Sequence, residues 1–364
     1  MAPSPHIVIL GAGLIGLSSA DALLRRGARV TLLERGGAVM RGASFANSGM
    51  IHPSQACSWS GPANDPAMDA AVHGLALHSV GLLERNMTEL GLPDLRDRPA
   101  GCYQIFDDAA QAQAACDRLS LRGIDVRGVA PGPATFGRPG LFFAQDRSAD
   151  AYAYGLALAD SVRVRGGTIR LGRDVSLDAG GARVRALIDG EPLDSDAVVL
   201  ACGAQTTTLL RHVGLGSCIE GVRGWSADFD VPPDHDLPPQ PVMDAATRSA
   251  LTLLSGTLRL SGTWGDASPD RLLSRWSDIL PRGVLSETGP NRIRSSLRPV
   301  SARGGPVIGP TPHPGLFVNA GHGHMGWTLC AGSGELLADI LLGGADPQVF
   351  SFDAQARSGA RKTQ

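Results

Sequence analysis

The sequence GAGLIG, residues 11–16, lies between an apolar run and a segment with helical periodicity. The apolar run at residues 6–10 is typical of a strand buried on both faces, and residues 14–26 gather leucine and alanine on one side of a helix. Residues 28–33 form a second apolar run that ends at Glu34. This order predicts a strand–helix–strand opening with a right-handed crossover, whose glycine-rich turn binds the pyrophosphate of a dinucleotide.

Each glycine of this turn has a distinct role in that interpretation. Gly11 allows the tight turn, Gly13 lets the backbone reach the pyrophosphate, and Gly16 lets the helix pack close to the strand. The pyrophosphate then lies at the helix N-terminus, where free N–H groups and the helix dipole favour negative charge. Glu34 stands where a carboxylate accepts a hydrogen bond from the ribose 2′-hydroxyl, and this carboxylate would repel the 2′-phosphate of NADP.

The segment after Glu34 indicates which dinucleotide binds. A domain that binds only NAD should continue through several uninterrupted strand–helix units. Here the second strand is followed by a long loop at residues 36–49, which is rich in glycine, alanine and serine. A loop of this length can follow an extended ligand, so the sequence favours FAD over NAD.

The rest of the chain alternates between two kinds of signal. Helical periodicity recurs at residues 69–90, 109–121 and 151–164, and strand patterns occur at 168–171, 183–188, 197–203 and, with antiparallel alternation, 251–263. Residues 231–241 form a proline-rich loop. We therefore expect an α/β fold in which a Rossmann-like FAD-binding domain is built from discontinuous segments and an antiparallel-sheet substrate domain is inserted. The expected division is 1–51, 141–220 and 296–364 for the FAD-binding domain, and 52–140 and 221–295 for the substrate domain.

A second glycine-rich turn lies near the end of the chain. An apolar strand at residues 316–319 runs through Gly321 and Gly323 into an apolar helix that is predicted to begin near Gly326. Glycine is entropically costly unless the backbone needs an unusual dihedral angle or a close approach. The N-terminus of this helix also presents unpaired N–H groups to whatever approaches it.

Composition excludes several classes of protein. The chain of 364 residues has a formal net charge of −2 and scattered arginines, so no nucleic-acid partner is expected, and no apolar run is long enough to predict a membrane span. The N-terminus lacks the basic region of a signal peptide. The histidines show no H-E-x-x-H spacing, and no C-x-x-C occurs among the cysteines, so we expect no metal, no disulfide framework and a cytoplasmic location. The cysteines are Cys57, Cys102, Cys116, Cys202, Cys218 and Cys330.

Three motifs together resemble the D-amino-acid dehydrogenase/oxidase-type (glycine oxidase-like) family of FAD-dependent oxidoreductases. They are GAGLIG with Glu34, the segment ASFANSGMI at residues 43–51, and LRPVSARGGPVIG at residues 297–309 followed by GHGHMGW. The segments AVVLACGA and VRGWS, at residues 197–204 and 222–226, also fit, so the likeness spans nearly the whole chain. It is greatest for the small, flavin-carrying subunit of bacterial D-amino-acid dehydrogenases.

The resemblance implies a noncovalent FAD between the two domains. The loop at residues 44–51 would run beside the flavin, Val175 would contact the adenine, and the helix beginning near Gly326 would point at the flavin N1–C2=O edge. A helix N-terminus there stabilises the negative charge of the reduced flavin by roughly 0.3–1 kcal/mol. The implied cofactor-binding residues are Gly11, Gly13, Leu14, Ile15, Gly16, Glu34, Arg35, Ser44, Asn47, Ser48, Gly49, Met50, Val175, Cys202, Gly203, Gly323, His324, Met325, Gly326, Trp327 and Thr328.

On the substrate side, Arg298 matches the family's Leu-Arg-Pro arginine, which binds the substrate carboxylate. A guanidinium can bind a carboxylate with two parallel hydrogen bonds. His52 or His324 is expected either to accept a proton from the amine or to act as a polar contact. Trp225 and Trp327 are expected either to wall the pocket or to pack in the core. Arg303 replaces the family's aspartate after Arg-Pro and is expected either to reshape the pocket or to add a second cation.

The expected reaction is FAD-dependent oxidation of the Cα–N bond of a small D-amino acid or glycine-like amine to an imine, which hydrolyses to a keto acid and ammonia. Two alternatives remain open: oxidation of a secondary amine such as sarcosine or a cyclic imino acid, and a non-catalytic FAD-binding assembly or regulatory protein. The electron acceptor is either oxygen or a quinone. Peripheral membrane association and a partner subunit are both compatible with the sequence.

Overall fold

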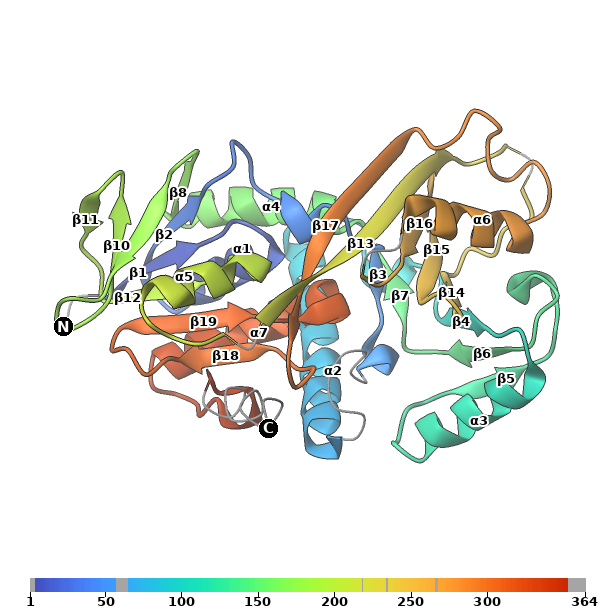
Figure 1. Cartoon of the computed structure of the whole chain (residues 1–364), viewed down its shortest axis with the longest axis horizontal. Coiled ribbons are helices and arrows are strands. Elements are labelled where there is room, and N and C mark those ends of the chain that lie inside the picture. Colours follow the sequence, from blue (N-terminus) through green and yellow to red (C-terminus); the bar gives the residue numbers. More distant parts are fainter. Residues whose placement is uncertain (1–3, 57–64, 218, 234, 266–267, 353–364) are drawn as a thin grey trace.

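The computed structural model describes residues 4–56, 65–217, 219–233, 235–265 and 268–352. A six-stranded sheet and an eight-stranded sheet form the two halves of the molecule, and the long paired strands β13 and β17 run from one half into the other (Figure 1). The expected α/β fold, with a mainly parallel sheet and a second, mainly antiparallel sheet, is therefore confirmed.

The six-stranded sheet contains the first and last strands of the described chain. Its strand order is β18-β19-β12-β1-β2-β8, and all neighbours are parallel except β18 and β19. Strands β1, β2, β12 and β19 confirm the strand predictions from the apolar runs, because each run is buried on both faces of the sheet. The bounds are β1 His6–Leu10, β2 Arg29–Glu34, β8 Thr168–Leu171, β12 Ala197–Leu200, β18 Val307–Pro310 and β19 Leu316–Ala320.

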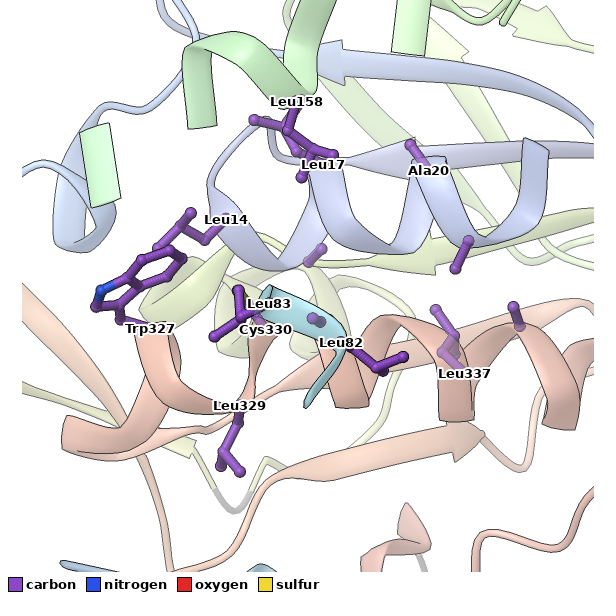
Figure 2. Packing of buried hydrophobic residues seen from close by; sticks show 14 of the residues in the cluster. Leu14, Leu17, Ala20, Leu82, Leu83, Leu158, Trp327, Leu329, Cys330 and Leu337 are labelled. Carbon is purple, nitrogen blue, oxygen red and sulfur yellow. The ribbon is translucent and has the colours of Figure 1, made fainter. Parts of the chain in front are cut away.

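Alternate side chains of this sheet enter two different cores. Ile7 and Ile9 of β1 join a cluster with four helices, whereas Val8 and Leu10 join a cluster with a short helix and a small sheet. Figure 2 shows side chains of the four helices converging in the first cluster. These helices are α1 Leu14–Arg25, α2 Pro66–Glu89, α4 Ala151–Val164 and α7 Gly326–Leu341; the other face carries α5 Thr206–His212 and strands β9 Val175–Asp178, β10 Arg185–Ile188 and β11 Glu191–Leu193.

The eight-stranded sheet has the order β17-β13-β16-β15-β14-β4-β6-β5. Its neighbours are antiparallel except β14 and β4, which run parallel. Trp276 of α6 is fully buried against one part of the sheet, and α3 packs on another part. The bounds are β4 Cys102–Ile105, β5 Arg127–Val129, β6 Gly140–Phe143, β13 Ile219–Asp230, β14 Val242–Asp244, β15 Ser249–Leu254, β16 Thr257–Gly262, β17 Arg292–Ser301, α3 Ala109–Ser120 and α6 Pro269–Ile279; a separate pair is β3 Met50–Ile51 with β7 Arg147–Ser148.

Four elements, α2, β6, β13 and β17, do not follow the expected domain division along the chain. Helix α2, within the expected substrate segment 52–140, packs on α7 and buries Val72 and Leu83 in the core of the six-stranded sheet. Strand β6, at the start of the expected FAD segment 141–220, pairs with β4 in the eight-stranded sheet. Strands β13 and β17 cross residues 220 and 296 without interruption, because their pairing is continuous from Ile219 to Asp228.

The helices differ in whether a side chain caps their N-terminus. The helices α2, α3 and α4 each begin with an aspartate, Asp65, Asp108 and Asp150, whose carboxylate accepts hydrogen bonds from backbone N–H groups of the first turn. The helices α1 and α7 follow Gly13 and Met325 and have no side-chain cap. Their first-turn N–H groups therefore need another partner.

Within the described ranges, no helix is long and apolar enough to cross a membrane. The same part of the chain brings together no group of three histidine, cysteine, aspartate or glutamate side chains suited to a metal ion.

Candidate cofactor and substrate site

A cavity of about 1150 Å³ extends from the glycine-rich turn after β1 to the strands of the eight-stranded sheet. It brings together residues that are far apart in the sequence, from the N-terminal turn to the start of α7. The predicted site residues that line it are Gly11, Gly13, Leu14, Ile15, Glu34, Arg35, Ser44, Asn47, Ser48, Met50, His52, Cys202, Gly203, Arg298, Gly323, His324, Gly326 and Trp327.

Six predicted site residues do not line this cavity. Gly16 and Gly49 pack behind the wall, where an added Cβ would meet Gly11 and Leu254 respectively. Val175 begins β9 and packs on the opposite face of the parallel sheet. Met325 is buried beneath the turn, and Thr328 accepts a hydrogen bond from the backbone N–H of His52. Trp225 packs against the core of the second sheet, while its neighbour Gly224 faces the cavity.

The N-terminal turn leaves no room for side chains. A Cβ on Gly16 would lie 1.8 Å from the carbonyl oxygen of Gly11, and one on Gly11, whose φ is 104°, would lie 2.6 Å from the carbonyl oxygen of Ala201. Contacts under about 3 Å of this kind cannot form without backbone movement. A Cβ on Gly13 would meet only the Ser44 hydroxyl, at 2.8 Å. Gly11 and Gly16 therefore shape the turn, and Gly13 borders the cavity.

Glu34 is held against the same turn. Its Oε2 accepts a hydrogen bond from the Ala12 N–H at 2.9 Å, and its Oε1 accepts one from the Gly36 N–H at 2.7 Å. These bonds fix the carboxylate at the cavity wall. Each oxygen of an ionised carboxylate has a second lone pair, so Glu34 can still accept a hydrogen bond from a ribose hydroxyl.

The loop between Ser44 and Met50 is folded by its own side chains. The Asn47 Oδ1 accepts a hydrogen bond from the Gly49 N–H at 2.7 Å, and the Ser48 hydroxyl accepts one from the Met50 N–H at 3.2 Å. The Ser44 hydroxyl accepts one from the Leu14 N–H at 3.0 Å. The loop thus reaches the start of α1 and lines the cavity as a fixed wall.

Several buried polar atoms along this cavity have no partner within the described part of the chain. They are Nδ1 of His52, Oδ1 of Asn319, both ring nitrogens of His322 and Nε1 of Trp327. A buried polar group without a hydrogen bond is costly, so such atoms indicate a polar ligand. An isoalloxazine ring carries both donors and acceptors, and the residues at this wall therefore fit a flavin.

The sequence did not single out His322 or Asn319. His322 lies inside the GHGHMGW segment that was recognised, between the two glycines that were selected, so its position in that segment was an available signal. Asn319 ends the apolar run of β19, and its amide donates to the Ser19 hydroxyl at 3.0 Å, a contact that sequence spacing does not reveal.

The histidines of the site are neutral. Burial lowers the pKa of His52 to about 4 and the pKa of His322 to about 3. Burial, helped by the charge of nearby groups, also lowers the pKa of His324 well below its usual value. His52 and His324 stack with ring centroids 5.7 Å apart, and Nε2 of His324 lies 3.0 Å from the Gln55 carbonyl oxygen. Such rings are poor proton acceptors and good neutral hydrogen-bonding contacts.

A buried carboxyl supports the turn that holds His324. Asp146 is fully buried and accepts hydrogen bonds from the Ser54 N–H at 3.2 Å and the Ser54 hydroxyl at 2.5 Å. Ser54 lies in the short turn Pro53–Gln55, whose Gln55 carbonyl contacts His324. Burial raises the pKa of Asp146 to about 7, although the Ser54 hydrogen bonds oppose the shift.

This pKa makes stability depend on pH in a definite direction. The folded-state pKa of Asp146 lies above the unfolded value near 4. The neutral carboxyl therefore makes its full contribution to the free energy of unfolding below about pH 4, and about 4 kcal/mol of that contribution is lost as the pH rises to about 7. Asparagine does not ionise, so we expect Asp146→Asn to remove this loss. The melting temperature of the variant minus that of the wild type should therefore increase as the pH is raised from 4.5 to 8. The histidines are present in both proteins and cancel in the difference. A difference that stays constant over this range would show that Asp146 does not titrate there.

Arg298 is a half-buried cation at the far end of the cavity. Its Nη1 donates to the Thr263 carbonyl at 2.7 Å and its Nη2 donates to the Gly262 carbonyl at 3.0 Å. None of the ion pairs among the described residues includes Arg298. Burial lowers the pKa of its guanidinium to about 10, so it stays charged at neutral pH. The carbonyls orient the guanidinium and leave its charge to be balanced by an anionic ligand.

Gly224 provides the space that Arg298 occupies. An added Cβ at Gly224 would lie 2.3 Å from Cζ of Arg298, because the guanidinium lies across β13 at this residue. We expect Gly224→Ala to displace the guanidinium and raise KM for a carboxylated substrate by about tenfold or more. The flavin spectrum should be retained, since the glycine turn after β1 and the loop at residues 44–50, which are expected to hold FAD, do not include Gly224. Steady-state kinetics and the absorption spectrum of the variant check this, and an unchanged KM would show that the guanidinium need not lie over Gly224.

The parallel sheet with its glycine turn, together with the cavity that reaches a second sheet, defines a flavin-binding oxidoreductase. The family model for FAD dependent oxidoreductases (DAO) matches residues 6–340, and the chain belongs to this family. Its cofactor is FAD, and the resemblance found in the sequence is confirmed.

Individual relatives agree with this assignment. A D-amino acid dehydrogenase of Methylobacterium radiotolerans is 29% identical, with 96% of this chain and 98% of the relative covered. Among solved structures, glycine oxidase from Geobacillus kaustophilus has a TM-score of 0.80 at 24% identity, with coverage of 96% and 98% of the two chains. Iminodiacetate oxidase from Chelativorans sp. BNC1 has a TM-score of 0.81 at 22% identity, with 95% and 98% covered. These structural likenesses establish the shared fold.

Proposed function

We propose that this enzyme oxidises the Cα–N bond of a small amino acid, either a D-amino acid or a glycine-like amine. When bound, FAD supplies the hydride acceptor, and water converts the imine product to a keto acid and ammonia. The observation that carries the proposal is the half-buried guanidinium of Arg298, which two carbonyl oxygens hold in the same cavity as the residues fitted to FAD.

Arg298 positions the substrate by its carboxylate. The guanidinium cannot rotate freely, since two carbonyl oxygens fix it, and a carboxylate bound to it takes one orientation. Holding a reactant in one pose is among the largest contributions that a binding site makes to rate. A dry, mainly neutral wall of His52, His322 and His324 completes this side of the pocket and favours the uncharged amine.

The same features support a secondary-amine substrate as the second candidate. One structural neighbour is titled an iminodiacetate oxidase and another an L-proline dehydrogenase, and both names denote secondary amines. The relatives named D-amino acid dehydrogenase favour a primary amine instead. We also place the enzyme in the cytoplasm, because its cysteines are scattered along the sequence without a disulfide or metal pattern. Its electron acceptor is oxygen or a quinone.

Anaerobic mixing of the flavin-loaded enzyme with candidate substrates tests the proposal. Loss of flavin absorbance with D-amino acids or glycine, but not with L-amino acids, supports it. Bleaching only by N-alkyl amino acids or cyclic imino acids favours the second candidate. Bound flavin that no carboxylated amine reduces would show that the proposed oxidation is wrong. Repeating the reaction with oxygen and with a soluble quinone identifies the acceptor.

A further inference from the structure

A second cavity, of about 620 Å³, lies on the other side of the loop at residues 44–50. Phe45 of that loop lines this second cavity, whereas Ser44 and Asn47 line the cofactor cavity, and Arg41 borders both. Neither FAD nor the proposed substrate accounts for the positive charge gathered in the second cavity. The arginines that line it are Arg41, Arg259, Arg292 and Arg294.

The register of the eight-stranded sheet brings three of these arginines together. Asp228 of β13 lies opposite Arg259 of β16 on one side and opposite Arg292 of β17 on the other. Residues that lie opposite each other share a face of the sheet, and so do residues two apart in one strand, so Arg294 joins this group. The Asp228 Oδ1 accepts a hydrogen bond from Arg259 Nε at 2.8 Å, and its Oδ2 accepts one from Arg294 Nη2 at 2.6 Å. One carboxylate is therefore shared by two arginines.

The ring of Phe45 places the fourth arginine beside this group. Cζ of Arg294 lies 4.6 Å from the centroid of the Phe45 ring, and Cζ of Arg41 lies 5.6 Å from the same centroid. The face of an aromatic ring attracts such cations. Arg259 Nη1 also donates to the Asn47 carbonyl at 3.3 Å, so the arginines are in contact with the loop at two of its residues.

The residues that line the second cavity carry more positive than negative charge. Four arginines and two aspartates line it, which gives a formal charge of +2. The Asp150 carboxylate accepts hydrogen bonds from two backbone N–H groups at the start of α4, and Asp228 binds the two arginines named above. Within the described ranges, no ion pair includes Arg41 or Arg292. The charge of these two arginines is therefore left to be balanced by a ligand.

Arg294 carries the most direct indication of such a ligand. The residue is only 8% exposed, and its Nε and Nη1 have no hydrogen-bond partner within the described part of the chain. Asp228 accepts only from its Nη2. A buried donor without an acceptor is costly, and more so when it belongs to a charged group. An oxyanion that accepts from these N–H groups removes that cost and forms strong, charge-assisted hydrogen bonds.

Arg303 contributes to neither cavity. The sequence suggested that it either reshapes the substrate pocket or adds a second cation. It forms an ion pair with Asp65 at the start of α2 instead, and it lines neither the cofactor cavity nor the second cavity.

We propose that the second cavity binds a phosphate group, either as free phosphate or as part of a phosphorylated small molecule. A phosphate monoester carries about −1.5 to −2 charges at pH 7, which matches the excess positive charge of the lining. Its several oxygens can accept hydrogen bonds from Arg294 and from the exposed Arg41 and Arg292 at the same time. A carboxylate, with a single charge, would leave one cation unbalanced. The bound phosphate would hold the loop at residues 44–50 from the side that Phe45 faces.

Calorimetric titration of the FAD-loaded enzyme tests this proposal. The probes are inorganic phosphate and phenyl phosphate, each added in chloride buffer at constant ionic strength. Bound FAD fills the pyrophosphate-binding turn, so the probes cannot bind there. We expect saturable binding of at least one probe with a Kd of about 1 mM or lower, weakening as chloride is added because Arg41 and Arg292 are exposed. Tighter binding of phenyl phosphate indicates a phosphorylated small molecule, and equal or weaker binding indicates free phosphate.

Two variants locate the binding in this cavity. Arg294→Met removes the unpaired N–H groups but keeps an apolar chain that can pack on Phe45. Arg292→Met removes an exposed cation and should not disturb the fold. Each variant should raise the Kd of the better probe at least tenfold. Arg271→Met, at an exposed position on α6 outside both cavities, is the matched control and should leave the Kd unchanged.

The titrations distinguish a phosphate site in this cavity from the alternatives. Absence of saturable binding of both probes to the wild type overturns the proposal. Binding that is unchanged in Arg292→Met and in folded Arg294→Met also overturns it, because the phosphate then binds elsewhere. If Arg294→Met does not fold, Arg292→Met decides alone. Amine oxidation does not enter these measurements, so they hold whether or not the proposed reaction is correct.

Discussion

Replacing Arg298 by methionine should lower kcat/KM for a carboxylated amine by roughly 30- to 4,000-fold while FAD stays bound. Truncating one member of a hydrogen-bonded charged pair inside a binding site costs about 2–5 kcal/mol, and each 1.4 kcal/mol corresponds to about tenfold in rate. The effect should be large because Arg298 lines the cavity and the Thr263 and Gly262 carbonyls hold it in one orientation. Arg298→Lys should recover little activity, since an ammonium group lacks the planar two-point geometry.

A control must separate the loss of carboxylate binding in Arg298→Met from a general loss of structure. A primary amine without a carboxylate should be a poor substrate for the wild type, and its kcat/KM should change little in Arg298→Met. The flavin spectrum and the melting temperature report on cofactor and fold in the same samples. If the variant oxidises carboxylated substrates as well as wild type does, the carboxylate is bound by another residue.

The elements around this site were largely predictable from local pattern. The bounds of β1, α1, β2 and α4, and the start of α7, agree with the sequence prediction to within one or two residues. Buried parallel strands are continuous apolar runs, and helices with one apolar face repeat every 3.6 residues, so both patterns are strong. The glycine pattern also predicted the tight turn after β1, where Gly11 and Gly16 tolerate no side chain.

Contacts between distant segments were not predictable in this way. Helix α2 was assigned to the substrate domain from its place in the sequence, yet its apolar side packs on α7. The pairing of β13 with β17 across residues 220 and 296 likewise depends on strand register, which a sequence without relatives does not reveal. Strands such as β13 and β17, which extend from one half into the other, cannot be divided between two domains from sequence order alone.

On the substrate side of the cavity, the contacts of single residues with distant segments were likewise not predictable from the sequence. Arg298 was selected because it stands in a recognisable motif, but the space that Gly224 leaves for it depends on the facing strand. Arg248 lines the cavity from the turn between β14 and β15, where its φ is 52°, and no sequence motif marks that turn or the cavity.

The second large effect is expected at the glycine turn. Gly16→Ala should weaken FAD binding by roughly 100-fold or more, because the added Cβ would lie 1.8 Å from the Gly11 carbonyl oxygen and must displace the turn that borders the cavity. Overpacking of this kind costs about 1–3 kcal/mol or more, and about 2.7 kcal/mol corresponds to 100-fold in Kd. Fluorescence titration of the apoprotein with FAD measures the change directly.

Gly81→Ala is the matched control for the same chemical change. Gly81 is exposed on α2, and an added Cβ there meets no atom within 4 Å, so the variant should bind FAD as wild type does. It should also be more stable by about 0.5–1 kcal/mol, because alanine is the better helix former. Circular dichroism of both apoproteins shows whether Gly16→Ala still folds. A folded Gly16→Ala variant with wild-type affinity for FAD would mean that the turn after β1 can move without loss of the cofactor, which contradicts its assignment as the pyrophosphate-binding turn.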